Sequence, residues 1–261
     1  MKNMNEYKYI SIVINKFDLP FEVKLATLDE DAINKELVDE TIEKISENIQ
    51  QYDDLFSLEN HDALLSRFQA GEETALMTSK TFREVYEQTI TAEQMTHHYF
   101  SSYYNGKYDP IGLLNGWMID KIFNRYLLSL LSDEGIDGVS LRCGEDVRLA
   151  SRPNIDFRWR IAIKDPKNLD ILLATYFLKN GAVSTANEMH SLRNEKSNVE
   201  QVTIVGNNAL DTNIWSSAGL SAGRKFSEFI TKYHLTGMIV DKYAGLENFR
   251  DGFSDKIPLR K

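Results

Sequence analysis

The sequence has 261 residues, of which 42% are hydrophobic and 26% are charged. This composition is typical of a soluble globular protein that can bury one large core or two modest ones. The formal net charge of −9 and the pI near 5.2 argue against nucleic-acid and membrane partners, because both are bound through clustered Lys and Arg.

The sequence also favours a cytoplasmic location. No apolar run approaches the roughly 20 residues that cross a bilayer, and residues 1–8 lack the apolar region of a secretion signal. The single cysteine, Cys143, excludes an internal disulfide and a cysteine-built metal site. A chain with a single cysteine is typical of a reducing compartment.

The chain begins with a predicted pair of strands and a long helix. Residues 9–14 and 21–28 are rich in β-branched and aromatic residues and flank a short turn. Asp29 and Asp31 are expected to cap the helix that follows. Apolar residues recur at helical spacing over residues 33–49, which indicates a surface helix with one buried face.

Two further helices are predicted in the middle of the chain. One opens at residues 79–80 and runs through Ile90, and an aromatic loop follows over residues 99–108. Apolar residues over 118–131 then form a clean helical stripe that stops before Gly135.

A glycine-punctuated segment precedes this last helix. Residues 108–120 read Tyr-Asp-Pro-Ile-Gly-Leu-Leu-Asn-Gly-Trp-Met-Ile-Asp. Gly112 and Gly116 lack a Cβ, so the backbone can bend sharply and approach a ligand closely, and the first N–H groups of the helix can meet an anion. The segment is a candidate phosphate cradle. A turn and helix cap without a ligand is the alternative.

The second half alternates short apolar strands with one helix. The predicted strands cover residues 139–142, 159–163, 202–205 and 238–240. A final helix is expected over residues 213–232. Its small residues between 216 and 223 require a close packing partner. This order of elements indicates an α+β fold, and because no linker is apparent we expect residues 1–261 to form one domain.

Several short motifs follow one another along almost the entire chain. They are Leu-Pro-Phe-Glu-Val at 19–23, Phe-Ser at 56–57, Ala-Leu-Leu-Ser-Arg-Phe at 63–68, the glycine segment, Arg-Cys-Gly-Glu-Asp-Val-Arg at 142–148, Trp-Arg-Ile-Ala-Ile-Lys-Asp-Pro at 159–166, Gly-Ala-Val-Ser-Thr at 181–185, and Val-Thr-Ile-Val-Gly at 202–206 followed by Trp-Ser-Ser-Ala at 215–218. In order and spacing they resemble the motifs of the ApbE-like flavin transferases, the FAD:protein FMN transferase family. The resemblance implies a two-lobed single chain with mainly antiparallel sheets flanked by helices.

The resemblance also implies an activity. Members of this family bind FAD between the lobes and, with Mg²⁺, transfer its FMN half to a Thr or Ser hydroxyl of an acceptor protein, releasing AMP; some relatives hydrolyse FAD instead. Such chemistry needs a cation that neutralises the pyrophosphate, donors that hold the phosphates, and a hydroxyl in line with the leaving group. The expected cofactors are FAD and Mg²⁺, and the expected partner is an acceptor protein.

The motif alignment assigns site residues. The metal is expected at the Gly112 carbonyl, Asn213 and Ser217, and the catalytic candidates are Asn213 and Asp109. The alternatives are an N-cap and a packing serine for Asn213 and Ser217, and a turn or cap role for Asp109. The expected cofactor-binding residues are Phe56, Ser57, Tyr99, Phe100, Ser101, Asp109, Asn115, Gly116, Gly144, Glu145 and Thr185.

The chain departs from the family pattern at several of these positions, and three of the departures change the charge of the site. Asn213 stands where the family has Asp, and Mg²⁺ prefers charged oxygen ligands. Asn115 replaces a Lys, and Glu145 replaces a Gly and adds negative charge. The sequence therefore predicts a weakened transferase. The alternatives are a catalytically degenerate flavin-binding or protein-binding relative without transferase activity, and a scaffold that binds neither flavin nor metal.

Overall fold

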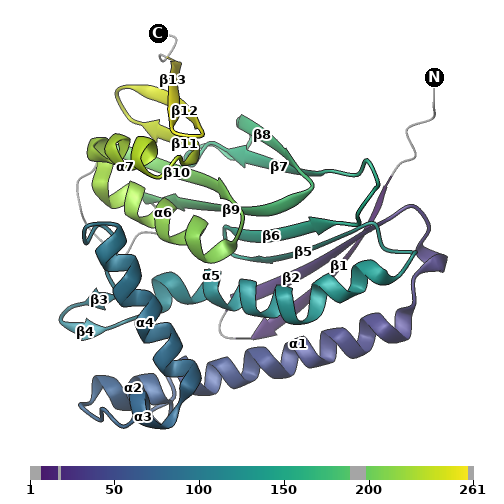
Figure 1. Cartoon of the computed structure of the whole chain (residues 1–261), viewed down its shortest axis with the longest axis horizontal. Coiled ribbons are helices and arrows are strands. Elements are labelled where there is room, and N and C mark those ends of the chain that lie inside the picture. Colours follow the sequence, from purple (N-terminus) through teal and green to yellow (C-terminus); the bar gives the residue numbers. More distant parts are fainter. Residues whose placement is uncertain (1–6, 17–18, 189–197, 258–261) are drawn as a thin grey trace.

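The protein is represented by a computed structural model that describes residues 7–16, 19–188 and 198–257. Its centre is a nine-stranded sheet in which every neighbouring pair of strands is antiparallel (Figure 1). In spatial order the strands are β1 (Lys8–Lys16), β2 (Leu19–Thr27), β5 (Gly138–Cys143), β6 (Asp146–Ser151), β9 (Asn180–Asn187), β10 (Val199–Gly206), β11 (Thr236–Asp241), β12 (Gly245–Arg250) and β13 (Phe253–Ile257).

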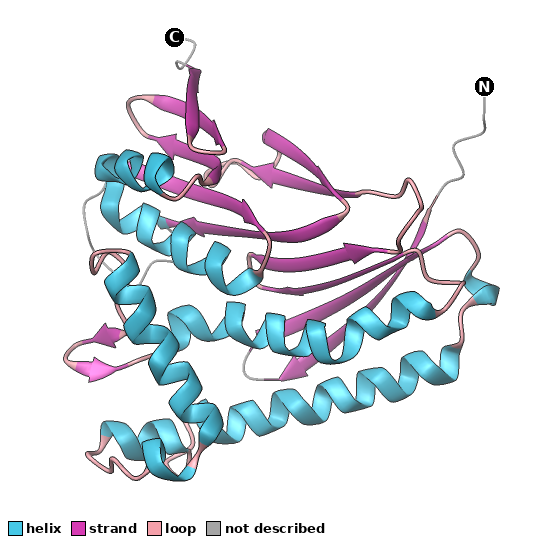
Figure 2. Ribbon diagram, in the orientation of Figure 1, coloured by secondary structure: helices cyan, strands magenta, loops and turns pink. Residues whose placement is uncertain are grey.

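The helices lie on one side of this sheet, and one short strand pair packs on its other side (Figure 2). The helices are α1 (Lys35–Phe56), α2 (Leu64–Gln69), α3 (Ala75–Thr78), α4 (Lys80–Met95), α5 (Ile111–Ile122), α6 (Ala209–Ala222) and α7 (Phe226–Lys232), and the short strand pairs are β3 (Tyr103–Tyr104) with β4 (Lys107–Tyr108) and β7 (Trp159–Lys164) with β8 (Leu172–Leu178). A π-helical segment, Phe123–Leu127, and a 3-10 turn, Leu128–Ser132, extend α5. In the described part of the chain, no helix is both long and apolar enough to cross a membrane.

Apolar side chains cover both faces of the sheet. The larger cluster joins the sheet to the helices and includes fully buried Phe21 and Leu25 on β2 and Ile45 on α1. The smaller cluster packs β7 against β6 and β9. Side chains along β7 alternate between buried and exposed, as expected for a strand with one covered face. Together these layers confirm the predicted α+β fold with antiparallel sheets flanked by helices.

The predicted strands are confirmed. The first pair corresponds to β1 and β2, and the four later runs lie in β5, β7, β10 and β11. Cys143 is buried in β5, as its small apolar character predicts. The helix predicted at residues 79–80 is α4, and the Ser79 hydroxyl caps it by accepting the Phe82 N–H at 3.1 Å.

The predicted cap of the first long helix is wrong. Asp29 caps only a short 3-10 turn, Glu30–Ala32, by accepting the Asp31 N–H. The true cap of α1 is Asn34, whose Oδ1 accepts the Leu37 N–H at 3.1 Å. A tertiary contact decides this start, because the Asn34 N–H donates to Asp133 Oδ2 at 2.9 Å.

Both helices that carry the candidate site begin earlier than predicted. Pro110 caps α5, so Gly112 and Gly116 lie inside the helix and not in a turn before it. Proline suits a helix start because its missing N–H has no partner there. Likewise, α6 begins at Ala209, where Asn208 Oδ1 accepts the Asp211 N–H at 2.7 Å. It breaks at Gly223, whose φ of +57° favours glycine.

Candidate functional site

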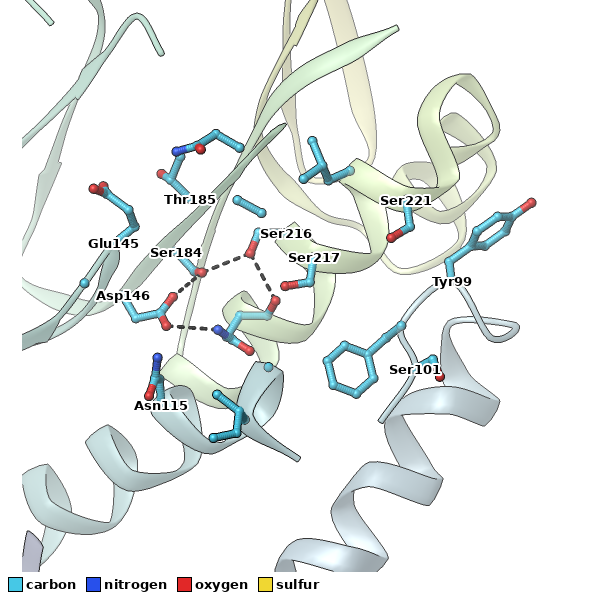
Figure 3. Close-up of a pocket in the computed structure, with 18 of the residues that line it drawn as sticks. Tyr99, Ser101, Asn115, Glu145, Asp146, Ser184, Thr185, Ser216, Ser217 and Ser221 are labelled. Carbon is cyan, nitrogen blue, oxygen red and sulfur yellow. Dashed lines mark hydrogen bonds between the residues drawn. The ribbon is translucent and has the colours of Figure 1, made fainter. Parts of the chain in front are cut away.

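A pocket of about 530 Å³ opens where α5 and α6 meet the β5–β6 turn and the end of β9. This volume lies within the range of about 300–1,000 Å³ that is typical of small-molecule sites. One wall is aromatic and comes from the segment after α4 and the β3–β4 hairpin. It comprises Tyr99, Phe100, Tyr103 and Tyr104. Another wall is α6, which presents the small side chains Ser216, Ser217 and Ser221 (Figure 3).

A buried hydrogen-bond network joins α6 to two strands at the base of this pocket. Asn213 Nδ2 on α6 donates to Asp146 Oδ2 on β6 at 2.9 Å. Ser184 on β9 donates to the other oxygen of Asp146. The Ser184 and Ser216 hydroxyl oxygens lie 2.9 Å apart, and Ser216 also donates to the Asn213 carbonyl at 3.0 Å (Figure 3). The network therefore holds one turn of α6 in register with β6 and β9.

Burial shapes the chemistry of this network. Asp146 is 6% exposed and Asn213 is 8% exposed. Burial raises the pKa of Asp146 to about 6, although the hydrogen bonds from Ser184 and Asn213 act in the opposite direction. Asn213 Oδ1 is itself buried and has no hydrogen-bond partner among the described residues. An unpaired buried oxygen is costly, so Asn213 Oδ1 is a candidate acceptor for a ligand or an ordered water.

Close contacts between α5 and α6 position Asn213. The Asp120 carboxylate on α5 accepts the N–H groups of Ala209 and Leu210 at 2.9 and 2.8 Å. These are the first two residues of α6, where free N–H groups and the helix dipole favour an anion. Arg148 Nε lies 3.6 Å from Asp120 Oδ1 and balances its charge. Sequence-distant segments are thereby locked together beside the pocket.

The charged side chains among the described residues that line the pocket are all acidic. Its carboxylates are Asp109, Glu145 and Asp146, and no Lys or Arg is among the described residues that line it. An anionic ligand would therefore meet unfavourable potential here unless a cation enters with it.

Most of the predicted site residues are brought together. The pocket is lined by the predicted residues Tyr99, Phe100, Ser101, Asp109, Gly112, Asn115, Gly144, Glu145, Thr185, Asn213 and Ser217. Asp109 also serves as a turn residue, because its Oδ1 accepts the Ile111 N–H at 3.0 Å. The N-cap alternative for Asn213 is wrong, since Asn208 caps α6 and Asn213 lies within the helix.

Three predicted residues do not line the pocket. Phe56 is fully buried and stacks on Phe82 with ring centroids 5.6 Å apart. Ser57 ends α1, where its N–H donates to the Asp53 carbonyl at 2.9 Å. Gly116 is buried against α6. Phe56 and Gly116 therefore act in packing, and Ser57 ends a helix.

Sequence reasoning also missed lining residues. They are Tyr103, Tyr104, Ile111, Asp146, Ser184, Ala186, Asn187, Ser216, Leu220 and Ser221. A signal existed for Asp146, because side chains alternate along β6, so that Asp146 faces the same side as the apolar Ala150, which is buried. A carboxylate that faces a covered side of a sheet needs polar partners, and Ser184 and Asn213 supply them.

The donor chemistry fits a hard divalent cation. Asn213, Ser217 and Gly112 all line the pocket, and amide, hydroxyl and carbonyl oxygens are ligands that Mg²⁺ and Ca²⁺ accept. Asp146 adds a negative charge beside them. Within the described residues, no group of three or more His, Cys, Asp and Glu side chains could hold a metal.

The fold of the chain is similar to that of several solved structures. No protein-family model and no curated protein sequence matches the chain. Among solved structures, the ApbE protein of Thermotoga maritima has a TM-score of 0.73 at 16% identity, covering 93% of this chain and 97% of its own.

Two further ApbE structures agree. The flavinyl transferase ApbE of Pseudomonas stutzeri has a TM-score of 0.67 at 13% identity, covering 91% of this chain and 93% of its own. The flavin transferase ApbE of Vibrio cholerae has a TM-score of 0.64 at 14% identity, covering 94% and 98%. Over almost its whole length, the chain therefore has the fold of the ApbE flavin transferases.

Proposed function

We propose that this pocket binds FAD together with a divalent cation, and that the protein transfers the FMN half of FAD to a Thr or Ser hydroxyl of an acceptor protein. One observation carries this proposal. The glycine segment that contains Gly112 and the helix that contains Asn213 and Ser217 are about one hundred residues apart in the chain, yet they line one pocket of ligand size. The motif resemblance pairs the same two segments in a flavin site.

The walls suit the parts of a flavin dinucleotide. Tyr103 and Tyr104 are about half exposed, so their rings are available for stacking on a flat ring system. Asn115 and Thr185 offer neutral polar groups for phosphate oxygens. Mg²⁺, held through Asn213, Ser217 and the Gly112 carbonyl, would supply the positive charge that the pyrophosphate requires.

The reaction itself makes limited demands on side chains. The acceptor hydroxyl oxygen bonds to the phosphorus on the FMN side, the P–O–P linkage breaks, and AMP leaves. Asp109 is the proposed acceptor of the hydroxyl proton, because its carboxylate lines the pocket at the start of α5. Water in place of the hydroxyl would give FMN and AMP by hydrolysis.

The substitutions in the pocket predict slow turnover. Asn213 offers a neutral oxygen to the cation, and Asn115 offers no charge to the phosphates. Glu145 brings a further carboxylate toward an anionic substrate. These same features favour the second candidate, a protein that binds flavin without transferring it.

The deciding experiment separates these candidates. The purified protein is incubated with FAD, Mg²⁺ and a Thr-containing acceptor protein, and the products are resolved by chromatography and mass spectrometry. AMP release with FMN attached to the acceptor supports the transferase, and both products must disappear with EDTA. Bound FAD without AMP would establish the inactive flavin binder, and absence of FAD binding would rule out both.

A further inference from the structure

Two buried side chains at the base of the pocket, Asp146 and Asn213, have hydrogen-bond acceptor sites that no described residue fills. A carboxylate offers about four lone-pair sites, and the hydrogen bonds from Ser184 and Asn213 use two of those on Asp146. The neighbouring Asn213 Oδ1 has no hydrogen-bond partner among the described residues, although Asn213 is only 8% exposed.

We infer that Asp146 supplies the charged ligand of a divalent-cation site in this pocket and that Asn213 Oδ1 supplies a neutral ligand beside it. This inference deepens the proposed function, since it concerns the same pocket, but cation binding can be measured without any flavin. Asp146 comes from β6, and it would give the site the negative charge that position 213 on α6 does not carry.

The unpaired oxygen of the Asn213 amide supports this inference. The Nδ2 of this amide donates to Asp146 Oδ2 at 2.9 Å, which leaves Oδ1 at the other end of the amide without a partner. In this orientation Oδ1 points away from Asp146 Oδ2, so one cation would reach both groups only after the amide turns over and Oδ1 replaces Nδ2 beside the carboxylate. A cation between the two oxygens would then offset their repulsion and satisfy the unpaired oxygen and the buried charge together.

The ligand types define the class of cation. Carboxylate, amide and hydroxyl oxygens, with Ser217 nearby in the same wall, favour hard ions such as Mg²⁺, Mn²⁺ and Ca²⁺. Glu145 provides a matched comparison. It is the next residue in the chain and lines the same pocket, but its side chain is exposed, so its charge is screened by salt.

The test measures Mn²⁺ binding to the full chain in the absence of flavin, by the loss of the free-ion electron paramagnetic resonance signal. We expect Asp146→Asn to weaken binding by about tenfold or more, and Glu145→Gln to weaken it by less than about threefold. Wild-type affinity in Asp146→Asn, or equal losses in both variants, would overturn the inference, as would a wild-type chain that binds no Mn²⁺ at millimolar concentration.

A second variant covers the possibility that Asp146→Asn does not fold. Asn213→Asp adds a carboxylate next to Asp146 and should tighten Mn²⁺ binding by about tenfold; unchanged affinity contradicts the inference. FAD binding is measured separately. If the protein binds Mn²⁺ but not FAD, the cation site is supported and the proposed function is rejected. If it binds FAD but not Mn²⁺, flavin binding is supported and the cation site is rejected.

Discussion

A Cβ atom added to Gly116 would lie 2.7 Å from the backbone carbonyl oxygen of Ala209. At this contact α5 and α6 pack closely beside the pocket, and the same Cβ would lie 3.0 Å from the Cβ of Asn213. Glycine is therefore required at position 116 to bring two helices together and not to bend a loop.

Gly116→Ala should destabilise the protein. Alanine favours a helix interior by about 0.5–1 kcal/mol, but overpacking against backbone atoms costs about 1–3 kcal/mol. We expect a net loss of about 1–2 kcal/mol in the free energy of unfolding, measured by urea denaturation. Gly112→Ala is the control, since its Cβ would meet only a Phe100 ring atom at 3.8 Å. Equal stability of the two variants would contradict this account.

Asp120→Asn should loosen the start of α6. The substitution removes the charge that receives two helix N–H groups and leaves the Arg148 guanidinium without its counter-charge. We expect a loss of about 2–3 kcal/mol in the free energy of unfolding.

The pairing is tested by combining Asp120→Asn with Arg148→Met. Once Asp120 is replaced by Asn, Arg148 no longer has a carboxylate partner. Arg148→Met should then reduce the free energy of unfolding by at least about 1 kcal/mol less than it does in the wild type. Strictly additive losses would show that the two side chains act independently.

Asn115→Lys should strengthen FAD binding in the presence of Mg²⁺. The pocket contains three carboxylates, Asp109, Glu145 and Asp146, and no basic residue among its described lining. A new ammonium group should lower the dissociation constant by about fivefold, or about 1 kcal/mol. Flavin fluorescence titrations at low and high salt measure the effect, which salt should reduce. Asn115→Met has similar length without charge, and the same gain in this variant would refute the electrostatic explanation.

Asp241→Asn should produce a pH-dependent loss of stability. Burial by itself raises the pKa of Asp241, but hydrogen bonds from the N–H groups of Ala244 and Tyr243, each 2.8 Å long, and the charge of Arg224 outweigh it, so the net pKa is lowered. Folding therefore favours the ionised form. The stabilisation is present above the unfolded pKa of about 4 and is lost as the pH falls through the lower folded pKa.

The measurement is the difference in unfolding free energy between the wild type and Asp241→Asn. We expect about 1–2 kcal/mol at pH 7 and a smaller difference at pH 3. Asp156→Asn is the control, because the Asp156 side chain is 96% exposed. A difference that stays constant with pH would contradict the predicted direction of the pKa shift.

Local patterns in the sequence predicted much of the fold. Short apolar runs bounded by Gly, Asp and Pro identified the strands that became β5, β7, β10 and β11, because such runs and their boundaries lie in consecutive residues. The order of short motifs indicated the ApbE architecture, and the pairing of Gly112 with Asn213 in one pocket agrees with that expectation.

Helix starts were less predictable. Several short polar residues before each helix could act as its cap, and the choice between them depends on distant contacts. Asn34 is selected by Asp133, and the start of α6 is held by Asp120. The small residues of α6 did indicate close packing, and a Cβ at Gly219 would lie 2.9 Å from the Phe226 ring.

By itself, the sequence determined the strands β1, β2, β5, β7, β10 and β11, the α+β class and the motifs that meet at the pocket, because each of these depends on residues close together in the chain. Only the tertiary structure decided that Asp146, Ser184 and Ser216 form the base of that pocket. The hydrogen bonds of these side chains and the raised pKa of Asp146 depend on burial and on partners from separate elements. Both exist only once the sheet and α6 pack together.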